Sequence, residues 1–306
     1  MMILTNTINK EDISIVVQGP IDDKNFMLVY KSIRMIFPLS RIIISTWEGQ
    51  DIKITDNNTK IIFNADPGAY KDTINKNFTN NLLRHIVSSL AGLMSCNTKY
   101  VLRMRSDLLL QSDDFIKYYN IFDKRNSAYK LFEKRIITST FFSKKFLSYR
   151  KLIHPVPFHI SDWIHFGLLE DLIEYYSSTV PKEPEQSHYF DDKFLGINKV
   201  NLLHSSHQYA PEQFLLSYLA YKKFNVKFDH YLDYNRYNIL ESEKIIANNF
   251  IIISPYQFKF YCTKQRNGND RYRLWSKYPF LIPSTLRRGL YTYREFTNDY
   301  KKYMGQ

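Results

Sequence analysis

The stretch Lys99-Tyr-Val-Leu-Arg-Met-Arg-Ser-Asp-Leu-Leu-Leu110 decides which fold this chain can adopt. It opens with an apolar run typical of a buried parallel strand and then becomes charged at Arg103, Arg105 and Asp107. Ligands of open α/β sheets bind beyond the carboxyl ends of such strands. Arginines suit phosphate oxygens, and a carboxylate suits a divalent metal that bridges phosphates. The stretch therefore predicts a phosphate-binding strand end; the alternative is an arginine–aspartate pair that merely flanks a loop.

Short β-branched runs upstream of this stretch predict the neighbouring strands of a parallel sheet. They cover residues 13–17, 41–46 and 60–63, and apolar residues at helical spacing predict helices at 25–37 and 77–94. Strand and helix alternate, as they do in βαβ nucleotide-binding sheets. The fold class is therefore predicted to be α/β, with a Rossmann-type nucleotide-binding half over residues 1–112.

Small or polar residues follow each of these predicted strands. Because the carboxyl ends of parallel strands share one edge of a sheet, we expect a ligand cleft there. Turns use glycine, proline and aspartate in any case; this alternative is strong for Asp66 but weaker for Trp47, since tryptophan is not a turn residue. The residues expected to line the nucleotide cleft, beside the charged stretch, are Gln18, Gly19, Pro20, Trp47, Glu48, Asp66 and Arg84.

The composition is that of a globular protein with a basic surface. The chain has 306 residues, of which 44% are hydrophobic, and its net charge of +12 favours nucleic acid, anionic lipid or phosphorylated small molecules as partners. Cys96 and Cys262 stand far apart, which argues against zinc and a disulfide scaffold and fits a reducing cytoplasm. Residues 1–12 lack the apolar stretch of a signal peptide, and no apolar run approaches the ~20 residues of a membrane span.

The sequence also lacks several common enzyme motifs. It contains neither G-x-G-x-x-G nor G-x-x-x-x-G-K-[ST], which argues against a dinucleotide oxidoreductase and a P-loop kinase. The motifs H-E-x-x-H and G-x-S-x-G are absent as well.

Residues 113–250 are predicted to form a second half that binds an acceptor. Strands are predicted at 135–140, 226–230 and 250–254. Asp162 stands beside Trp163, and such a pair can bind a sugar, because the ring stacks on CH groups while the acid accepts hydrogen bonds from hydroxyls. Ser161 and Asp162 are also expected to cap a helix over 163–176, which does not exclude the site.

Glu212 is a second carboxylate candidate in this half. Pro211 suits an early position in a helix, so a helix is predicted to start there with Glu212 in its first turn. The helix dipole helps to keep a carboxylate at that place ionised, as a general base must be. Acids also occur in first turns for stability alone. The sequence thus offers Glu212 and Asp162 as catalytic bases, with Glu212 favoured.

Residues 251–306 form a basic aromatic C-terminal region, in which arginines and lysines alternate with tyrosines and Trp275. This composition is typical of a surface for anionic lipid or nucleic acid, and equally of a solvated basic helix. We expect a helical tail that contacts a membrane peripherally, because no membrane span is predicted.

Six short motifs occur in order between residues 12 and 235, and together they resemble the WavE-like lipopolysaccharide-synthesis proteins, which are regarded as glycosyltransferases. The set is more specific than any of its members. The motifs are Val17-Gln-Gly-Pro-Ile21, Ser45-Thr-Trp-Glu-Gly49, Asp66-Pro-Gly68, Arg103-x-Arg-Ser-Asp107, Ser161-Asp-Trp163 with Phe166-Gly167, and Pro211-Glu-Gln213.

The resemblance implies a GT-A-like fold, in which a mixed sheet joins a nucleotide-binding half to an acceptor half. Enzymes of that fold usually carry a D-x-D after a strand, whose carboxylates hold a metal on the donor diphosphate. The matching triplet here is Arg105-Ser106-Asp107, so arginine replaces the first acid. Asp107 could hold a divalent metal, Mn or Mg, or Arg105 could neutralise phosphate itself.

We therefore expect a cytoplasmic glycosyltransferase, peripheral on the inner face of the cell membrane. It would move a sugar from a nucleotide-sugar donor to a lipopolysaccharide, capsule or other surface-glycan acceptor. Arg103 and Arg105 would offset phosphate charge, while Asp162, Trp163 and Glu212 would face the acceptor. A non-catalytic nucleotide-sugar-binding scaffold is the alternative, motivated by the replaced acid. A nucleic-acid-binding protein ranks last, because the basic residues cluster away from the α/β part.

Overall fold

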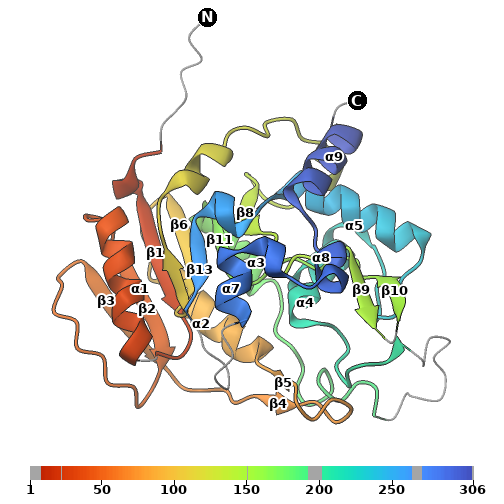
Figure 1. Ribbon diagram of the computed structural model, residues 1–306, viewed down its shortest axis with the longest axis horizontal. Coiled ribbons are helices and arrows are strands. Elements are labelled where there is room, and N and C mark those ends of the chain that lie inside the picture. The colour runs from red at the N-terminus through yellow and green to blue at the C-terminus, as the bar shows by residue number, and fades with distance from the viewer. Residues whose placement is uncertain (1–7, 22, 150, 192–201, 264–270, 305–306) are drawn as a thin grey trace, which may run out of the picture.

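A seven-stranded mixed sheet runs through the centre of the computed structural model, which describes residues 8–21, 23–149, 151–191, 202–263 and 271–304 (Figure 1). The strands of this sheet are β1 (Ile13–Gln18), β2 (Ile42–Trp47), β3 (Thr59–Asn64), β6 (Tyr100–Arg105), β8 (Ile136–Ser139), β11 (Ile164–Leu168) and β12 (Phe250–Ile253). Their order is β12-β8-β11-β6-β1-β2-β3. The four strands predicted in the first half are confirmed, and they are neighbours.

Within this sheet, β11 runs against the other strands. Strands β6, β1, β2 and β3 pair in parallel, as do β8 and β12, whereas β11 is antiparallel to both β6 and β8. The first half is thus the predicted Rossmann-type unit, and the whole sheet is mixed, as predicted. The direction of β11 brings its starting end to the edge where the parallel strands end, and there the Arg105 N–H donates to the Trp163 carbonyl at 3.2 Å.

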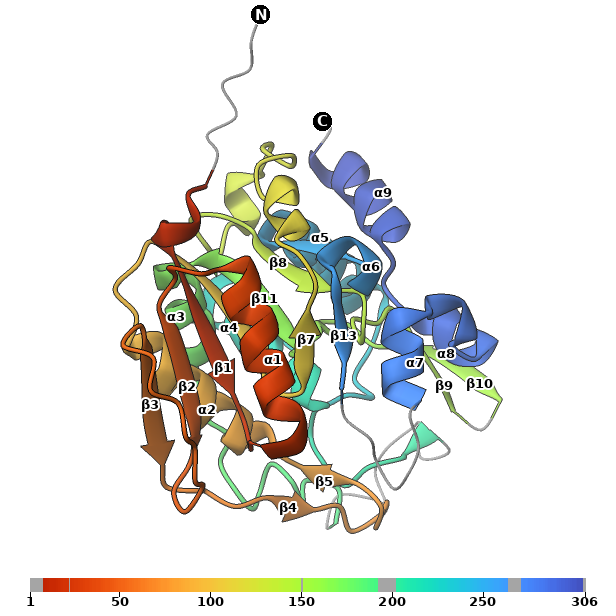
Figure 2. The ribbon, with the colours of Figure 1, turned by 60° about the vertical axis from the view of Figure 1, so that its left-hand side comes forward.

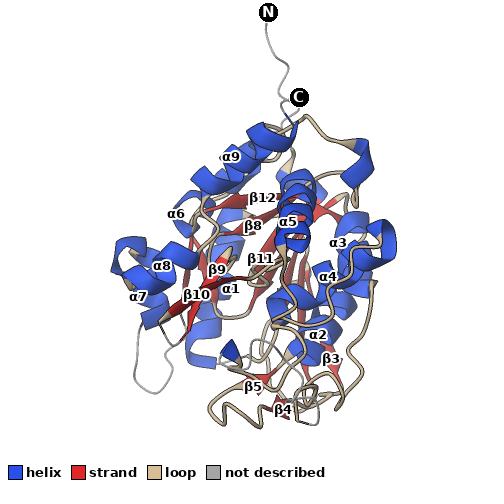
Figure 3. Ribbon diagram, turned by 90° about the vertical axis from the view of Figure 1, so that its right-hand side faces the viewer, coloured by secondary structure: helices blue, strands red, loops and turns tan. Residues whose placement is uncertain are grey.

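Helices cover both faces of the sheet. Helix α1 (Asp23–Ile36) lies on one face, while α2 (Leu82–Met94) and α3 (Leu169–Ser177) pack together on the other (Figure 2). Helix α4 (Pro211–Phe224) lies beside α3, and Figure 3 shows the strands enclosed between helices. Helix α5 (Arg236–Asn249) leads directly into β12.

Burial on both faces explains why the first strands are continuous apolar runs. All six residues of β1 and of β2 are buried, so neither strand needs the polar alternation of a half-exposed sheet. Gly92 lets α2 approach closely, since a Cβ there would lie 2.4 Å from Cγ1 of Val16. This contact fixes the first turn of α2, which carries Arg84 and His85, relative to the end of β1.

Shorter elements complete the chain. Three two-stranded ladders pair β4 with β5, β7 with β13 and β9 with β10. Their bounds are β4 (Tyr70–Lys71), β5 (Thr79–Asn80), β7 (Leu108–Leu110), β13 (Phe260–Cys262), β9 (Phe146–Tyr149) and β10 (Leu152–Pro155). The short helices are η1 (Lys10–Asp12), η2 (Asp114–Tyr118), η3 (Ser127–Tyr129), α6 (Pro255–Phe258), α7 (Arg271–Lys277), η6 (Pro279–Leu281), α8 (Ser284–Gly289) and α9 (Tyr293–Met304).

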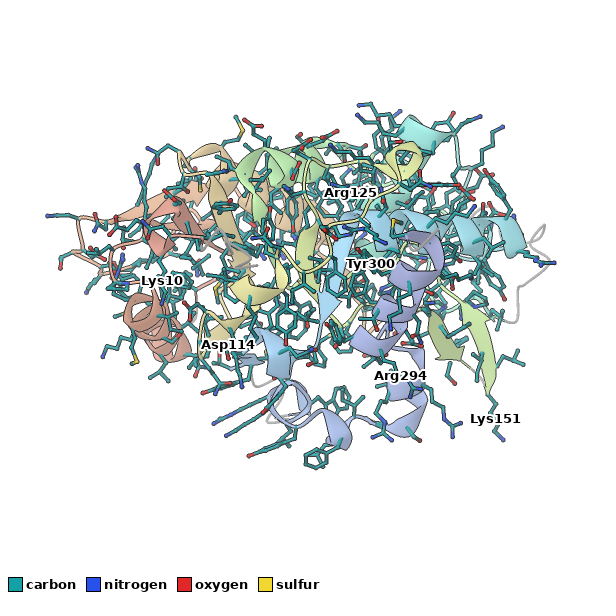
Figure 4. All side chains as sticks on the ribbon, turned by 90° about the horizontal axis from the view of Figure 1, so that it is seen from above. Lys10, Asp114, Arg125, Lys151, Arg294 and Tyr300 are labelled. Atoms are coloured by element: carbon teal, nitrogen blue, oxygen red, sulfur yellow. The ribbon has the colours of Figure 1, made fainter. Side chains whose placement is uncertain are left out.

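The C-terminal region is helical as predicted, and α9 is packed into the rest of the fold. Phe296 of α9 is fully buried, and Asp299 pairs with Lys145 at 2.7 Å. The Tyr300 hydroxyl reaches the segment that carries Arg125 (Figure 4), where it accepts a hydrogen bond from the Lys124 N–H at 3.1 Å. One apolar core contains residues from all three predicted segments, 1–112, 113–250 and 251–306. The packing therefore does not test the boundaries between these segments, which stay predictions.

Two predicted elements in the second half are wrong. Residues 163–176 do not form one helix: strand β11 comes first and α3 follows, because residues 164–168 complete the sheet between β6 and β8. Ser161 caps no helix; its hydroxyl donates to the Phe141 carbonyl at 2.6 Å. Residues 226–230 form no strand, whereas the strands predicted at 135–140 and 250–254 are confirmed as β8 and β12.

No helix in the described part of the chain combines the length and the apolar composition that crossing a membrane requires.

Candidate functional site

A cavity of about 970 Å³ opens at the carboxyl edge of the parallel strands. Its walls come from the ends of β1, β2 and β6, the first turns of α1, α2 and α4, the β4–β5 hairpin and the residues that precede β11. Of the predicted site residues, all but Glu48 and Arg103 line this cavity. The structure therefore brings together side chains that lie up to 194 positions apart, from Gln18 to Glu212.

The end of β1 forms a tight backbone turn beneath the cavity. Gly19 adopts a φ of 109°, which L side chains rarely take, and a Cβ there would approach Ser106 Oγ at 3.4 Å. The Ser106 N–H donates to the Gln18 carbonyl at 2.9 Å, and its hydroxyl donates to the Pro20 carbonyl at 2.5 Å. The carboxyl ends of strands β1 and β6 are thus held together. Because Gly19 has no side chain, a nucleotide can approach its backbone in the cavity.

On the neighbouring wall, Arg84 and Asp66 form a two-pronged ion pair. Arg84 Nε donates to Asp66 Oδ1 at 2.7 Å, and Nη2 donates to Oδ2 at 2.6 Å. The hydrogen bond from Arg84 is the main reason why the pKa of Asp66 lies below its usual value. Trp47 lines the same region of the cavity, whereas the Glu48 side chain is exposed outside it. The cleft prediction for Glu48 is therefore corrected: the chain turns after Trp47 and carries Glu48 away.

At the end of β6, Arg105 and Asp107 make a similar pair. Arg105 Nε donates to Asp107 Oδ1 at 3.0 Å and Nη2 to Oδ2 at 2.6 Å, while the guanidinium lies over the Trp163 ring at 4.4 Å from the centroid. Burial lowers the pKa of Arg105, but the Asp107 carboxylate outweighs this and raises it overall. Arg105 is therefore a fixed cation, oriented by a carboxylate on one side and an aromatic face on the other.

Arg103 does not reach the cavity, so the structure corrects its predicted contact with phosphate. Its side chain is fully buried beneath the site, where Nε donates to Ser89 Oγ at 2.9 Å. Its two terminal nitrogens donate to the Asp162 carbonyl and to His85 Nε2. Arg103 therefore helps to fix Asp162 and His85, which themselves line the cavity.

These contacts determine the tautomer of His85. A guanidinium only donates hydrogen bonds, so His85 Nε2 must accept from Arg103, and its proton must lie on Nδ1. Nδ1 lies 3.1 Å from Asp162 Oδ2, to which it donates. Burial, followed by the charge of Arg103, holds the pKa of His85 well below its ordinary value, so the ring is neutral. Asp162 is thus held by neutral His85 on one side and faces the cavity on the other.

Glu212 lies at the far end of the cavity in the first turn of α4, which begins at Pro211 as predicted. Its pKa is raised to about 7, first by burial and then by the charge of Asp162, while Lys144 opposes the change. The prediction that the helix dipole keeps Glu212 ionised is therefore corrected: burial and a second carboxylate outweigh the dipole. A carboxylate with a pKa near neutrality can accept a proton in one step and return it to solvent in the next.

Three further cavity residues were not among the predicted site residues: Lys144, His159 and His204. His159 Nε2 lies 3.9 Å from Glu212 Oε2. Burial and then the charge of Lys144 lower the pKa values of His159 and of His204, so both rings are neutral. They come from separate loops, and no motif or periodicity in the sequence groups them.

A divalent metal does not fit the residues at Asp107. Both carboxylate oxygens already accept hydrogen bonds from Arg105. Within the ranges that the structure describes, no group of three or more histidine, cysteine, aspartate or glutamate side chains could hold a metal ion. The guanidinium of Arg105 occupies the place where a second acid would complete a metal site.

Comparison with known proteins identifies the family. The sequence profile described as WavE lipopolysaccharide synthesis matches residues 13–272. No curated protein matches the chain. Among solved structures, the chain is similar to an active-site mutant of LgtC, with 9% sequence identity and a TM-score of 0.35 over 63% of this chain and 70% of that one. Because the profile match spans most of its length, the chain belongs to the WavE lipopolysaccharide synthesis family.

Proposed function

We propose that the protein is a glycosyltransferase that moves a sugar from a nucleotide-sugar donor to a lipopolysaccharide, capsule or other surface-glycan acceptor. The observation that carries this proposal is one cavity at the carboxyl edge of the sheet that holds both a fixed cation, Arg105, and a carboxylate of raised pKa, Glu212. Membership of a lipopolysaccharide synthesis family supports the acceptor class.

The donor would bind on the side of β1, β2 and β6. Gly19 and Pro20 offer backbone at close range, and Trp47 offers an aromatic surface for the nucleoside. Arg105 would meet the diphosphate, and Asp107 would act as a positioning residue that orients it. Because a guanidinium carries this role, we expect no metal ion to be needed.

The transfer step needs a base and a stabilised leaving group. Glu212 would take the proton from the acceptor hydroxyl, and the oxygen of that hydroxyl would bond to the anomeric carbon of the donor. The bond from that carbon to the diphosphate breaks, and its electron pair leaves on the phosphate oxygen, where Arg105 offsets the growing charge. Asp162 is the alternative base, although its hydrogen bond to His85 suits a positioning role.

A binding experiment tests the donor side first. The melting temperature of the protein should be measured alone and with UDP-, CMP-, GDP- and dTDP-sugars. We expect sugars of one nucleotide class to raise it. A ligand at 100 times its Kd stabilises the native state by about 2.7 kcal/mol. When the protein is mixed with the preferred donor and with lipopolysaccharide or capsule fragments, it should then release the free nucleoside diphosphate or, from a CMP-sugar, the free nucleoside monophosphate. Absence of binding by every nucleotide sugar would overturn the proposal.

A non-catalytic nucleotide-sugar-binding scaffold is the second candidate. The closed Arg105–Asp107 pair in place of a metal-binding acid pair favours it. Tight donor binding without turnover in any acceptor screen would support this reading, whereas release of nucleotide coupled to a glycosylated product would exclude it.

Peripheral attachment to an anionic membrane is also part of the proposal. Leu274, Tyr278, Phe280 and Leu281, hereafter the α7–η6 patch, are exposed hydrophobic side chains. Exposed cations on α7 and α8 flank them, namely Arg273, Lys277, Arg287 and Arg288. Apolar side chains framed by cations suit an interface of anionic lipid. Residues 264–270 and 305–306 of the predicted membrane-contacting region lie outside the described residues.

A further inference from the structure

Lys144 brings a positive charge into the cavity near Glu212, and the proposed mechanism does not use it. Its side chain lines the cavity beside Leu147 and Val156. Burial lowers its pKa, and the carboxylate of Glu212 opposes that change. Over the residues that the structure describes, no hydrogen bond or salt bridge engages Lys144 Nζ; the group lies 5.6 Å from the centroid of the Phe142 ring.

The two arginines that line the cavity, unlike Lys144, are each paired with an aspartate. Arg84 is held by both oxygens of Asp66, and Arg105 by both oxygens of Asp107. A buried charge without a paired partner costs free energy, so proteins pair such charges or supply them to a ligand. Among the described residues, Lys144 is thus the cavity cation that no hydrogen bond or ion pair holds, and only the more distant charge of the Glu212 carboxylate acts on it.

His159 lies next to this cation. Its side chain is 5% exposed, its Nε2 lies 3.9 Å from Glu212 Oε2, and its backbone carbonyl accepts a hydrogen bond from the Lys144 N–H at 3.1 Å. After burial, the charge of Lys144 is the next cause of the lowered pKa values of His159 and His204, so the ammonium lies near both rings. A neutral imidazole adds no positive charge, so Lys144 is the group that can attract an anionic ligand to this side of the cavity.

We infer that the acceptor carries an oxyanion, a phosphate or a carboxylate, which binds Lys144 next to the hydroxyl that is deprotonated. This inference rests on the proposed function and names the substrate class on its acceptor side. A neutral glycan would displace water from the cavity and leave only the Glu212 carboxylate to offset the charge of the ammonium, and that carboxylate becomes neutral when it takes the proton. An oxyanion gives that ammonium a charge-assisted hydrogen bond.

The position of Lys144 assigns this anion to the acceptor and not to the donor diphosphate. Lys144 lies close enough to Glu212 to influence its pKa, and Glu212 is the proposed base that must touch the acceptor hydroxyl. The donor diphosphate has Arg105 at the end of β6, on the side of Gln18 and Ser106.

Calorimetric titration of the full chain tests the inference. The probes are three matched sets, each a neutral hexose, its 6-phosphate and its uronate, from glucose, galactose and mannose. Binding of at least one anionic probe should be about 10-fold or more tighter than binding of its neutral hexose. Lys144→Gln should remove that preference, Lys144→Arg should retain most of it, and the exposed control Lys227→Gln should not change it. The 6-phosphate and uronate arms distinguish the two sources of the oxyanion.

Three outcomes would overturn the inference. The first is no charge preference in any of the three sets. The second is a preference that survives Lys144→Gln in a protein that still melts cooperatively. The third is that Lys144→Gln weakens binding of the free nucleoside diphosphate more than binding of the anionic hexose, which would assign Lys144 to the donor. Failure of the proposed function itself is distinguishable, since it would appear as absent nucleotide-sugar binding while the probe preference persisted.

Discussion

At the scale of single residues, Glu212 is the side chain on which the proposed chemistry depends. Replacement of its carboxylate by an amide in Glu212→Gln removes the base without changing the shape of the side chain. We expect transfer to fall by about 10²-fold or more, while donor binding and the melting temperature barely change. Glu170→Gln is the matched control, because Glu170 also lies in the first turn of a helix but is exposed. If Glu212→Gln keeps its rate and Asp162→Asn loses it without loss of stability, the base is Asp162.

The pKa of Glu212 also predicts how rate and stability vary with pH. Transfer should rise as pH increases through about 7, where the folded-state carboxylate ionises. The unfolded group ionises near its ordinary value of 4.5, so the folded state holds the proton more tightly, and stability should fall between about pH 4.5 and 7. Asp162→Asn removes a neighbouring charge and should shift the rate midpoint to lower pH. Urea unfolding at pH 5 and pH 8 should show a smaller pH dependence for Glu212→Gln than for the wild type.

Asp107 separates the arginine mechanism from a metal mechanism. Asp107→Asn weakens the pair that orients Arg105, so transfer should fall to background while the fold stays intact. Activity of the wild type should persist in EDTA, because the residues at Asp107 do not fit a metal. The exposed residue Asp51, which pairs with Lys53, provides the control Asp51→Asn. Loss of wild-type activity in EDTA, restored by Mn²⁺, would contradict this prediction.

The sequence predicted most residues of the site because parallel strands bring their ends to one edge. Gln18, Trp47 and Arg105 each follow an apolar run, so their common location could be inferred without coordinates. The failures have a physical reason too. Arg103 and Arg105 lie two positions apart and so share one face of β6, but only Arg105 stands at the end of the strand. Arg105 therefore reaches the cavity, whereas Arg103, farther back along the strand, is fully buried.

At the scale of elements, the contact between α2 and β1 determines where Arg84 and His85 lie. In Gly92→Ala the new Cβ would meet Val16 Cγ1 at 2.4 Å and Ser45 Cβ at 3.3 Å. Overpacking of this kind costs about 1–3 kcal/mol, which exceeds the gain of up to about 1 kcal/mol from better helix propensity. We therefore expect a net loss of about 1–2 kcal/mol in the free energy of unfolding, measured by urea denaturation.

A double-mutant cycle tests the cause of that loss. Val16→Ala removes the methyl group that the new Cβ would meet, so the effect of Gly92→Ala should shrink or reverse in that background. Equal destabilisation in both backgrounds would show that the contact with Val16 is not responsible.

The misassigned segment 163–176 shows where prediction of elements ends. Residues Ile164 to Leu168 lack the alternation of polar and apolar side chains that marks a half-exposed strand. The reason is that β11 is buried on both faces, by α3 and by the core. His165 is fully buried there, with hydrogen bonds to the Tyr176 hydroxyl and the Ser161 carbonyl at 2.8 Å each. These partners come from tertiary structure, so local periodicity could not separate this strand from the helix that follows.

At the scale of the whole molecule, the C-terminal region joins a buried core contact to an exposed surface. Truncation near residue 265 would remove Tyr291 and Phe296 from the core, so point substitutions are the better test of membrane contact. The double variant Phe280→Ser with Leu281→Ser should lose sedimentation with anionic liposomes at low salt. The control is Met35→Ser with Leu39→Ser, since those side chains are also exposed, at 82% and 64%, but lie in and after α1. Equal loss in both variants would show non-specific binding.

The direction of β11 has a consequence for how such proteins can diversify. Along the parallel strands, the residues that reach the cavity are encoded after each strand, whereas Asp162 and Trp163 are encoded before β11. The segments proposed for the donor and the residues before β11 proposed for the acceptor are therefore separate along the chain. Recombination or insertion between β8 and β11 would alter the side of the cavity proposed for the acceptor, while the segments proposed for the donor are inherited unchanged. If the proposed function holds, a lineage can thus change the glycan that it modifies and keep the same activated sugar.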